Sequence, residues 1–192
     1  MTIASRTTLS LSMITLVLGG MVAQASRAGE QDQTALLQAL PKSKLTLAEG
    51  LKQSTKGTET PISAKFELDD NKQLSLSVYT AEKGLAVDSE HNVLKELAGS
   101  PEKTPWAPKT EVFKDLPHVA RASEHLTLTA VAKDSLAEIV TRAQKEHPGT
   151  VFSIAPATQD KKPVFAVLVA DKGKVSEYWY DAMTGAEVSA KK

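Results

Sequence analysis

Two stretches of the chain match each other at one fixed spacing of 89 residues, without gaps, over residues 47–84. The match begins where Leu47-Ala48-Glu49 meets Leu136-Ala137-Glu138, and it ends where Ala81-Glu82-Lys83-Gly84 meets Ala170-Asp171-Lys172-Gly173. Chance identity at a single spacing is the alternative, but helix starts and turns recur at matching places. The pattern therefore predicts an internal duplication, so that the chain must fold as two similar units.

Each predicted unit opens with the same helix signal. Thr46-Leu47-Ala48-Glu49 and Ser135-Leu136-Ala137-Glu138 are capping boxes, in which a hydroxyl and a carboxylate satisfy free amides at the start of a helix. After the second box, apolar residues recur at the spacing of one buried helix face; they are Leu136, Ile139, Val140 and Ala143. A shorter helical stretch, Ala35–Leu40, comes before the first box and stops at Pro41.

Strand patterns follow each of these helices. In the first unit, residues 62–68 and 74–79 predict a strand pair, and Leu85–Asp88 offers a short third strand. In the second unit, the matching pair is Thr150–Ala155 and Val164–Ala170. The expected fold class is α+β, with two tandem units that are each a helix packed on a small antiparallel sheet.

The chain ends in an aromatic strand followed by a tight turn. Residues 174–182 are rich in aromatic and β-branched side chains, which favour strands, and Glu187-Val188 begins a short return strand. Gly185 lies between them, where the turn needs a positive φ that only glycine adopts without strain. On these residues alone, an ordinary hairpin is the alternative interpretation.

With both copies compared, the second unit resembles the PepSY family. The resemblance is carried by the capped helix, the strand pair and the stretch Tyr180–Val188, which contains the pattern D-A-x-T-G. The first unit departs from the family, because Asp88–Val93 lacks the Thr-Gly pair, so it is expected to be a degenerate copy. PepSY modules are known from propeptides of thermolysin-type metalloproteases and from exported bacterial proteins. The resemblance implies a non-catalytic module for protein binding or protease inhibition, and it transfers no catalytic residues.

The sequence predicts four segments: a signal peptide (1–25), a first, degenerate PepSY-like unit (26–97), a proline-rich linker (98–122) and a second PepSY-like unit (123–192). The signal has a basic start, an apolar stretch and the cleavage pattern Ala23-Gln24-Ala25. An uncleaved membrane anchor is the alternative. We expect the mature chain to be periplasmic and not membrane-spanning.

The predicted linker contains four prolines and no hydrophobic period; they are Pro101, Pro105, Pro108 and Pro117. Trp106 is expected to pack into the fold as an anchor. Leu126–Thr129 could be a short strand or a lead-in to the next helix.

Catalytic and metal-binding patterns are weak in this chain. It has no cysteine, and its 23 basic and 23 acidic residues leave no excess charge for nucleic acid. No serine lies in a G-x-S-x-G elbow, and the four histidines are scattered; they are His91, His118, His125 and His147. We predict a non-enzyme without a cofactor, and a metal site only through long-range assembly. A hydrolase would need a Ser or Asp beside a His in a cleft.

The middle strand of the second unit is apolar on both faces. Its outer face carries Val164, Ala166 and Leu168, where the first unit has Ser75, Ser77 and Tyr79. Such a face is either covered, here by the first unit or the linker, or waits for a partner.

We therefore predict a partner surface made of this outer face and the aromatic strand: Val164, Ala166, Leu168, Tyr178, Trp179 and Tyr180. The predicted function is an exported non-catalytic binding module for a protein or peptide in the periplasm, with inhibition of a protease as its more specific form. The alternative is a small-ligand or metal-linked periplasmic sensor or carrier, whose mark would be two or more clustered histidines.

Overall fold

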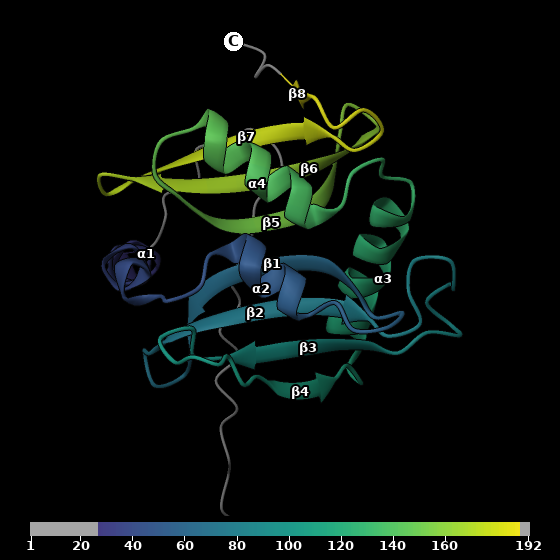
Figure 1. Cartoon of the computed structure of the whole chain (residues 1–192), viewed down its shortest axis with the longest axis horizontal. Helices are drawn as coiled ribbons and strands as arrows, with labels where there is room; N and C mark the ends of the chain where they lie inside the picture. Colours follow the sequence, from purple (N-terminus) through teal and green to yellow (C-terminus); the bar gives the residue numbers. More distant parts are fainter. Residues whose placement is uncertain (1–26, 189–192) are drawn as a thin grey trace, which may run out of the picture.

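The computed structural model describes residues 27–188, with side chains from residue 32 onward, and the predicted signal peptide at residues 1–25 lies outside this range. The described residues form an α+β fold of four α-helices and one eight-stranded antiparallel sheet (Figure 1). None of the described helices combines the length and the apolar character that crossing a bilayer requires.

The helical elements are α1 (Arg27–Ala39), the 3-10 turn η1 (Leu40–Lys42), α2 (Leu47–Gln53), α3 (Leu116–Ala130) and α4 (Leu136–Glu146). The strands are β1 (Thr60–Leu68), β2 (Leu74–Ala81), β3 (Leu94–Gly99), β4 (Lys109–Val112), β5 (Thr150–Gln159), β6 (Lys162–Asp171), β7 (Lys174–Asp181) and β8 (Glu187–Val188).

The strand order is the same in both directions from the middle of the sheet. The full order is β4-β3-β2-β1-β5-β6-β7-β8, so each outward step from β1 or β5 reaches the next strand along the chain. At the centre, β1 and β5 pair through Ala64 with Ile154 and through Lys65 with Ser153. The duplication predicted from the sequence agrees with this order, and it stays a prediction.

Both predicted capping boxes are present and place α2 and α4 on one face of the sheet. Thr46 caps α2 together with Glu49, and Ser135 caps α4 together with Glu138. The two helices contact each other over the centre of the sheet, as Figure 1 shows. One hydrophobic core lies beneath them and includes residues of both halves, among them Leu51, Leu76, Ile139 and Phe165.

Helix α3 packs against the opposite face of the sheet. In β2, Leu76 and Val78 belong to the core under α2, whereas Tyr79 and Ala81 belong to a second cluster. Since successive strand residues point to opposite faces, the second cluster lies on the far side. It contains Ala122 and Leu126 of α3, together with Ile62 and Leu94 of the strands. The sheet is thus covered by helices on both faces in its first half.

The predicted third strand at Leu85–Asp88 is wrong. This stretch is a turn, because the Asn92 side-chain amide donates to the carbonyl oxygens of Gly84 (2.9 Å) and Val87 (3.0 Å). Because a side chain already donates to those carbonyls, the backbone there does not have to pair with a neighbouring strand to satisfy them. The third strand is instead β3, which pairs along β2.

The segment predicted to be an irregular linker has regular structure. Residues 98–122 contain the end of β3, all of β4 and the first turns of α3. Pro117 lies in the first turn of α3, where a helix does not need the missing N–H. Leu126–Thr129 belongs to α3 and is not a strand. Trp106 is buried as predicted, and its Nε1 donates to the carbonyl of Gly99 at 3.2 Å.

In the first strand of each half, equivalent residues are one residue further apart in the chain than the spacing of 89 in the sequence match. Ala64 pairs with Val78, and Ile154 pairs with Val167, so Ala64 corresponds to Ile154. Each strand also has a bulge, at Ile62 in β1 and at Phe152 in β5. The sequence match of Ile62 with Val151 is therefore off by one residue.

Candidate binding groove

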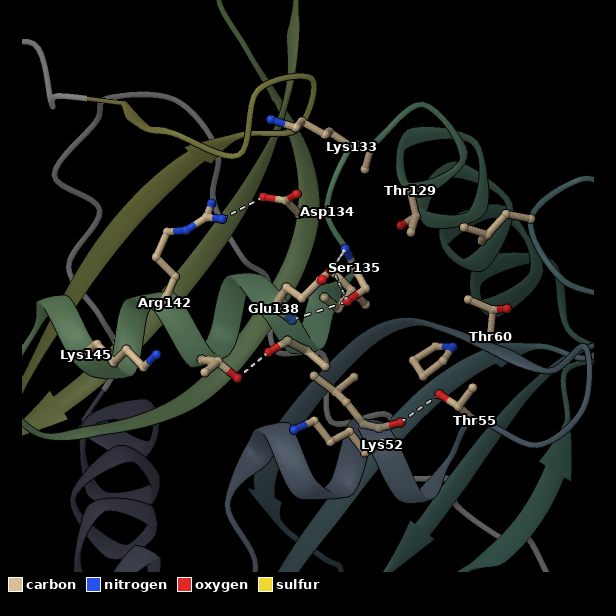
Figure 2. Close-up of a pocket in the computed structure, with 17 residues that line it drawn as sticks. Lys52, Thr55, Thr60, Thr129, Lys133, Asp134, Ser135, Glu138, Arg142 and Lys145 are labelled. Atoms are coloured by element: carbon tan, nitrogen blue, oxygen red, sulfur yellow. Dashed lines mark hydrogen bonds and ion pairs between the residues drawn. The ribbon is translucent and has the colours of Figure 1, made fainter.

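An open groove of about 1050 Å³ lies where α2, α4 and the end of α3 meet (Figure 2). Its walls come from α2, the start of β1, the α3–α4 connection and the exposed side of α4. The lining residues are Leu51, Lys52, Thr55, Thr60, Pro61, Leu85, Thr129, Ala132, Lys133, Asp134, Ser135, Leu136, Ala137, Glu138, Thr141, Arg142 and Lys145. The groove thus exists because the two capped helices pack against each other.

Glu138 lines the groove, but its carboxylate caps the start of α4. Its Oε2 accepts hydrogen bonds from the Ser135 amide and from the Ser135 hydroxyl, each at 2.8 Å. These two bonds lower the pKa of the Glu138 carboxyl below its ordinary value. The carboxylate is therefore ionised at neutral pH, and one of its oxygens already accepts two hydrogen bonds from Ser135.

Asp134 is also occupied, by an arginine that reaches the last turn of the chain. Arg142 Nη2 donates to Asp134 Oδ2 at 2.8 Å, and Arg142 Nη1 donates to the carbonyl of Gly185. The Asp134–Arg142 pair thereby connects the groove wall to the turn between β7 and β8. Both acidic residues of the groove are paired within the protein.

Three lysines of the groove have no such partner. Within the described part of the chain, no carboxylate lies within ion-pair distance of Lys52, Lys133 or Lys145. In Figure 2, Lys52 on α2 and Lys145 on α4 lie on the side of the pocket away from Thr129. Three lysines and Arg142 line the groove against two carboxylates, Asp134 and Glu138, so the groove carries an excess of positive charge that favours an acidic ligand.

Thr129, near the end of α3, contributes a polar atom without a partner. The residue is 3% exposed, and its Oγ1 makes no hydrogen bond with the described residues. Leaving a buried hydroxyl unsatisfied costs roughly 1–3 kcal/mol. A ligand group that reached this hydroxyl would recover part of that cost.

None of the predicted partner-surface residues lines the groove. Val164 and Ala166 are buried, whereas Leu168, Tyr178 and Trp179 are half-buried. Trp179 pairs across the ladder with Ala166 and so lies on the outer face of the sheet.

Tyr180 is a core residue and is not available to a partner. It is fully buried, and its hydroxyl donates to Glu146 Oε2 at 2.9 Å. Burial, reinforced by that carboxylate, raises the pKa of the Tyr180 phenol well above its ordinary value.

Each histidine has a different neighbour. His91 contacts Asp88 and His118 contacts Asp115, both at the surface. His147 lies beside Glu187, in a group with Glu146 that could hold a metal ion. The described residues therefore do not form the cluster of two histidines that would mark a metal-linked carrier.

His125 and Ser63 form the one described pair that resembles part of a hydrolase. His125 Nδ1 lies 3.0 Å from Ser63 Oγ. Burial, assisted by the nearby Arg121 charge, lowers the pKa of His125 to about 4. Neither residue lines the groove, so the pair is not presented to a substrate there.

The groove residues were not identified from the sequence. Lys52 and Lys145 each lie near the end of a capped helix, at positions that read as ordinary solvent-facing lysines. Only the contact between α2 and α4 brings them together. The local signal that could have been used is the capping box itself, since it fixes where both helices begin.

Comparison with known proteins agrees with the resemblance drawn from the sequence. Residues 135–191 match the family model PepSY, described as peptidase propeptide and YPEB domain. None of the curated proteins compared with the chain matches it. Among solved structures, the chain is similar to that of a candidate lipoprotein from Clostridium difficile 630, with 15% identity and a TM-score of 0.35. That similarity covers 69% of this chain and 81% of the other.

Proposed function

We propose that the chain, whose residues 135–191 match the PepSY family model, is an exported, non-catalytic module that binds a protein or peptide in the periplasm. The observation that carries the proposal is the positive groove. Lys52, Lys133 and Lys145 line it without a carboxylate partner among the described residues, and the buried hydroxyl of Thr129 lies in its wall.

The groove favours an extended acidic segment over a small molecule. Its volume of about 1050 Å³ lies just above the range for small-ligand pockets, roughly 300–1,000 Å³. Carboxylates of the segment would pair with the lysines, and a backbone or side-chain polar group would bond to Thr129. Apolar contact would come chiefly from the half-buried Leu85, since Leu51 and Leu136 are buried beneath the groove.

The more specific form of the proposal is restraint of a protease. It is supported by the family description, which names peptidase propeptides. The half-buried residues Leu168 and Trp179, on the outer face of β6 and β7, provide a second candidate surface for the same partner, whereas Tyr178 lies on the opposite face against His147. The proposed export rests on the sequence pattern of residues 1–25.

The division into two PepSY-like units at 26–97 and 123–192 belongs to the same proposal. The symmetric strand order about β1 and β5 supports it, as do the two capping boxes and the paired bulges. A small-ligand or metal-linked sensor or carrier is the alternative function.

Fluorescence anisotropy with labelled peptides tests the groove. The mature chain, residues 26–192, is titrated against an extended peptide rich in Asp and Glu and against the same peptide with Asn and Gln. We expect the acidic peptide to bind more tightly, and Lys52→Glu/Lys145→Glu to weaken it by roughly tenfold or more. The control Lys103→Glu/Lys114→Glu makes the same charge change at exposed positions away from the groove.

Equal binding by the groove variant and the parent would reject the groove. In that case, a folded Leu168→Asp/Trp179→Ser variant decides whether the β6–β7 surface binds instead. A second assay measures peptide hydrolysis by a thermolysin-type metalloprotease with increasing amounts of the mature chain. Unchanged hydrolysis at saturating chain would remove the protease form of the proposal and leave peptide binding standing.

A further inference from the structure

The C-terminal end of α4, directly after the groove residue Lys145, holds a histidine between two carboxylates. Glu146 is the last residue of α4, His147 is its C-cap, and Glu187 begins β8. We propose that these three residues bind a divalent transition-metal cation of the Zn²⁺ type. The proposal does not depend on the function of the groove.

The distances suit a single ion. One ligand atom from each residue lies within 4.8 Å of the other two, and His147 Nε2 lies 3.2 Å from Glu187 Oε2. Zinc binds nitrogen and oxygen at about 2.0–2.2 Å, so two ligands of one tetrahedral ion are about 3.4 Å apart. Small side-chain adjustments would therefore bring all three atoms onto one cation.

His147 presents an unsatisfied ring nitrogen at this place. Its Nε2 is shielded from solvent and has no hydrogen-bond partner among the described residues, although Glu187 Oε2 is close. The carboxylate oxygen is thus near enough for charge attraction but is not aligned for a hydrogen bond. The ring is held by stacking on Tyr178, with centroids 3.4 Å apart and planes at 12°. A cation would satisfy the orphaned nitrogen without moving the ring.

The surroundings of Glu146 also favour a cation. The Tyr180 hydroxyl donates to its Oε2 at 2.9 Å, which orients the carboxylate as outer-shell partners do in metal sites. Glu146 also ends a helix, where the backbone carbonyls and the macrodipole make negative charge unfavourable. A metal ion would offset that charge.

The donor set indicates the class of metal. One imidazole with two carboxylates suits zinc and its first-row neighbours better than magnesium or calcium, which prefer oxygen alone. Three protein ligands leave a fourth position for water or for a group of a partner. A bound ion would tie the end of α4 to β8, next to the Gly185 turn.

Isothermal titration of the EDTA-treated mature chain with ZnCl₂ at neutral pH tests the site. We expect a single equivalent to bind, and both Glu187→Gln and His147→Gln to weaken it by at least about tenfold. Tyr180→Phe keeps the three ligands and removes only the bond to Glu146, so it should weaken zinc by about 10–100-fold. The control is His91→Gln/Asp88→Asn, which removes an exposed histidine–carboxylate pair at 2.8 Å.

Glu187→Gln is the deciding variant, since Glu187 is exposed and its loss should leave the fold intact. Circular dichroism checks the fold of each variant, and the His147 ring signals in NMR spectra report where zinc binds. Absence of zinc binding by the parent would overturn the proposal. Parent-like binding by folded Glu187→Gln, or loss of binding in the His91/Asp88 control, would overturn it as well.

Discussion

Gly185 combines a backbone requirement with a steric one. Its φ is positive, as the sequence predicted, at +73°, and a Cβ built there would collide with the Asp134 carboxylate and contact Arg142 Nη1. Gly173, in the turn before β7, has a similar φ of +77° but open space around it. The two glycines therefore separate strain in the backbone from crowding by neighbours.

We predict that Gly173→Ala costs about 1 kcal/mol and Gly185→Ala roughly 2 kcal/mol or more of unfolding free energy. The additional cost arises because the new methyl group displaces the Asp134–Arg142 pair from the turn. Urea denaturation of both variants beside the parent measures the difference. Equal losses would mean that the pair contributes nothing, and a parent-like Gly185→Ala would contradict the turn itself.

Helix α3 carries a pH-dependent contact with the sheet. His125 faces Ser63 of β1 and has a pKa lowered to about 4, chiefly by burial and then by the charge of Arg121. An unfolded histidine has a pKa near 6.5, so between these two values the unfolded chain takes up a proton that the folded chain refuses. The contact therefore contributes fully above about pH 6.5 and loses its contribution as the pH falls toward 4.

We predict that acidification over this window destabilises the fold by up to about 3 kcal/mol through His125 alone. His125→Gln cannot charge and should flatten the pH dependence of the unfolding free energy between pH 6.5 and 4. His91→Gln, an exposed histidine, serves as the control. A His125→Gln profile parallel to that of the parent would show that α3 docking is insensitive to this proton.

The elements that the sequence predicted correctly are those with local causes. Capping boxes and alternating strands depend on residues that are neighbours in the chain, and both appear where expected. Helix α3 was missed because Leu126-Thr127-Leu128-Thr129 alternates like a strand. Its helical signal is the spacing of the buried residues Ala122, Leu126 and Thr129, which runs across a segment with a proline near its start.

The candidate site was less predictable than the elements. Lys52 and Lys145 belong to different helices, and the group of Glu146, His147 and Glu187 joins α4 to β8. Nothing in the local sequence reports these contacts, since they depend on how α4 packs. The predicted surface on β6 and β7 was wrong at Tyr180, which is buried. Alternation shows that Tyr180 and Trp179 point to opposite faces of the strand, but it does not show which face is buried.

At the scale of the whole molecule, the two halves share one sheet and one core. Residues from both halves lie in the same hydrophobic cluster, and β1 pairs directly with β5. We predict a single cooperative unfolding transition, because neither half can lose its packing without exposing the core of the other. The chain has two tryptophans, Trp106 in the first half and Trp179 in the second, so each half can be followed separately.

The variants Trp106→Phe and Trp179→Phe each keep one tryptophan. In each variant, the urea midpoint from tryptophan fluorescence should equal the midpoint from circular dichroism. Coincident transitions by fluorescence and circular dichroism are the test of two-state behaviour. Two separate midpoints would instead indicate that the halves are independent units.

The junction of β1 with β5 has a consequence for any shortened chain. Without the first half, β5 would be an unprotected sheet edge that a second copy could use as a template. Two such copies could pair with each other through β5, but only above the concentration that their affinity requires. The covalent connection through β3, β4 and α3 fixes the local concentration of one half around the other. The paired sheet therefore survives dilution in a way that no dimer of half-chains could.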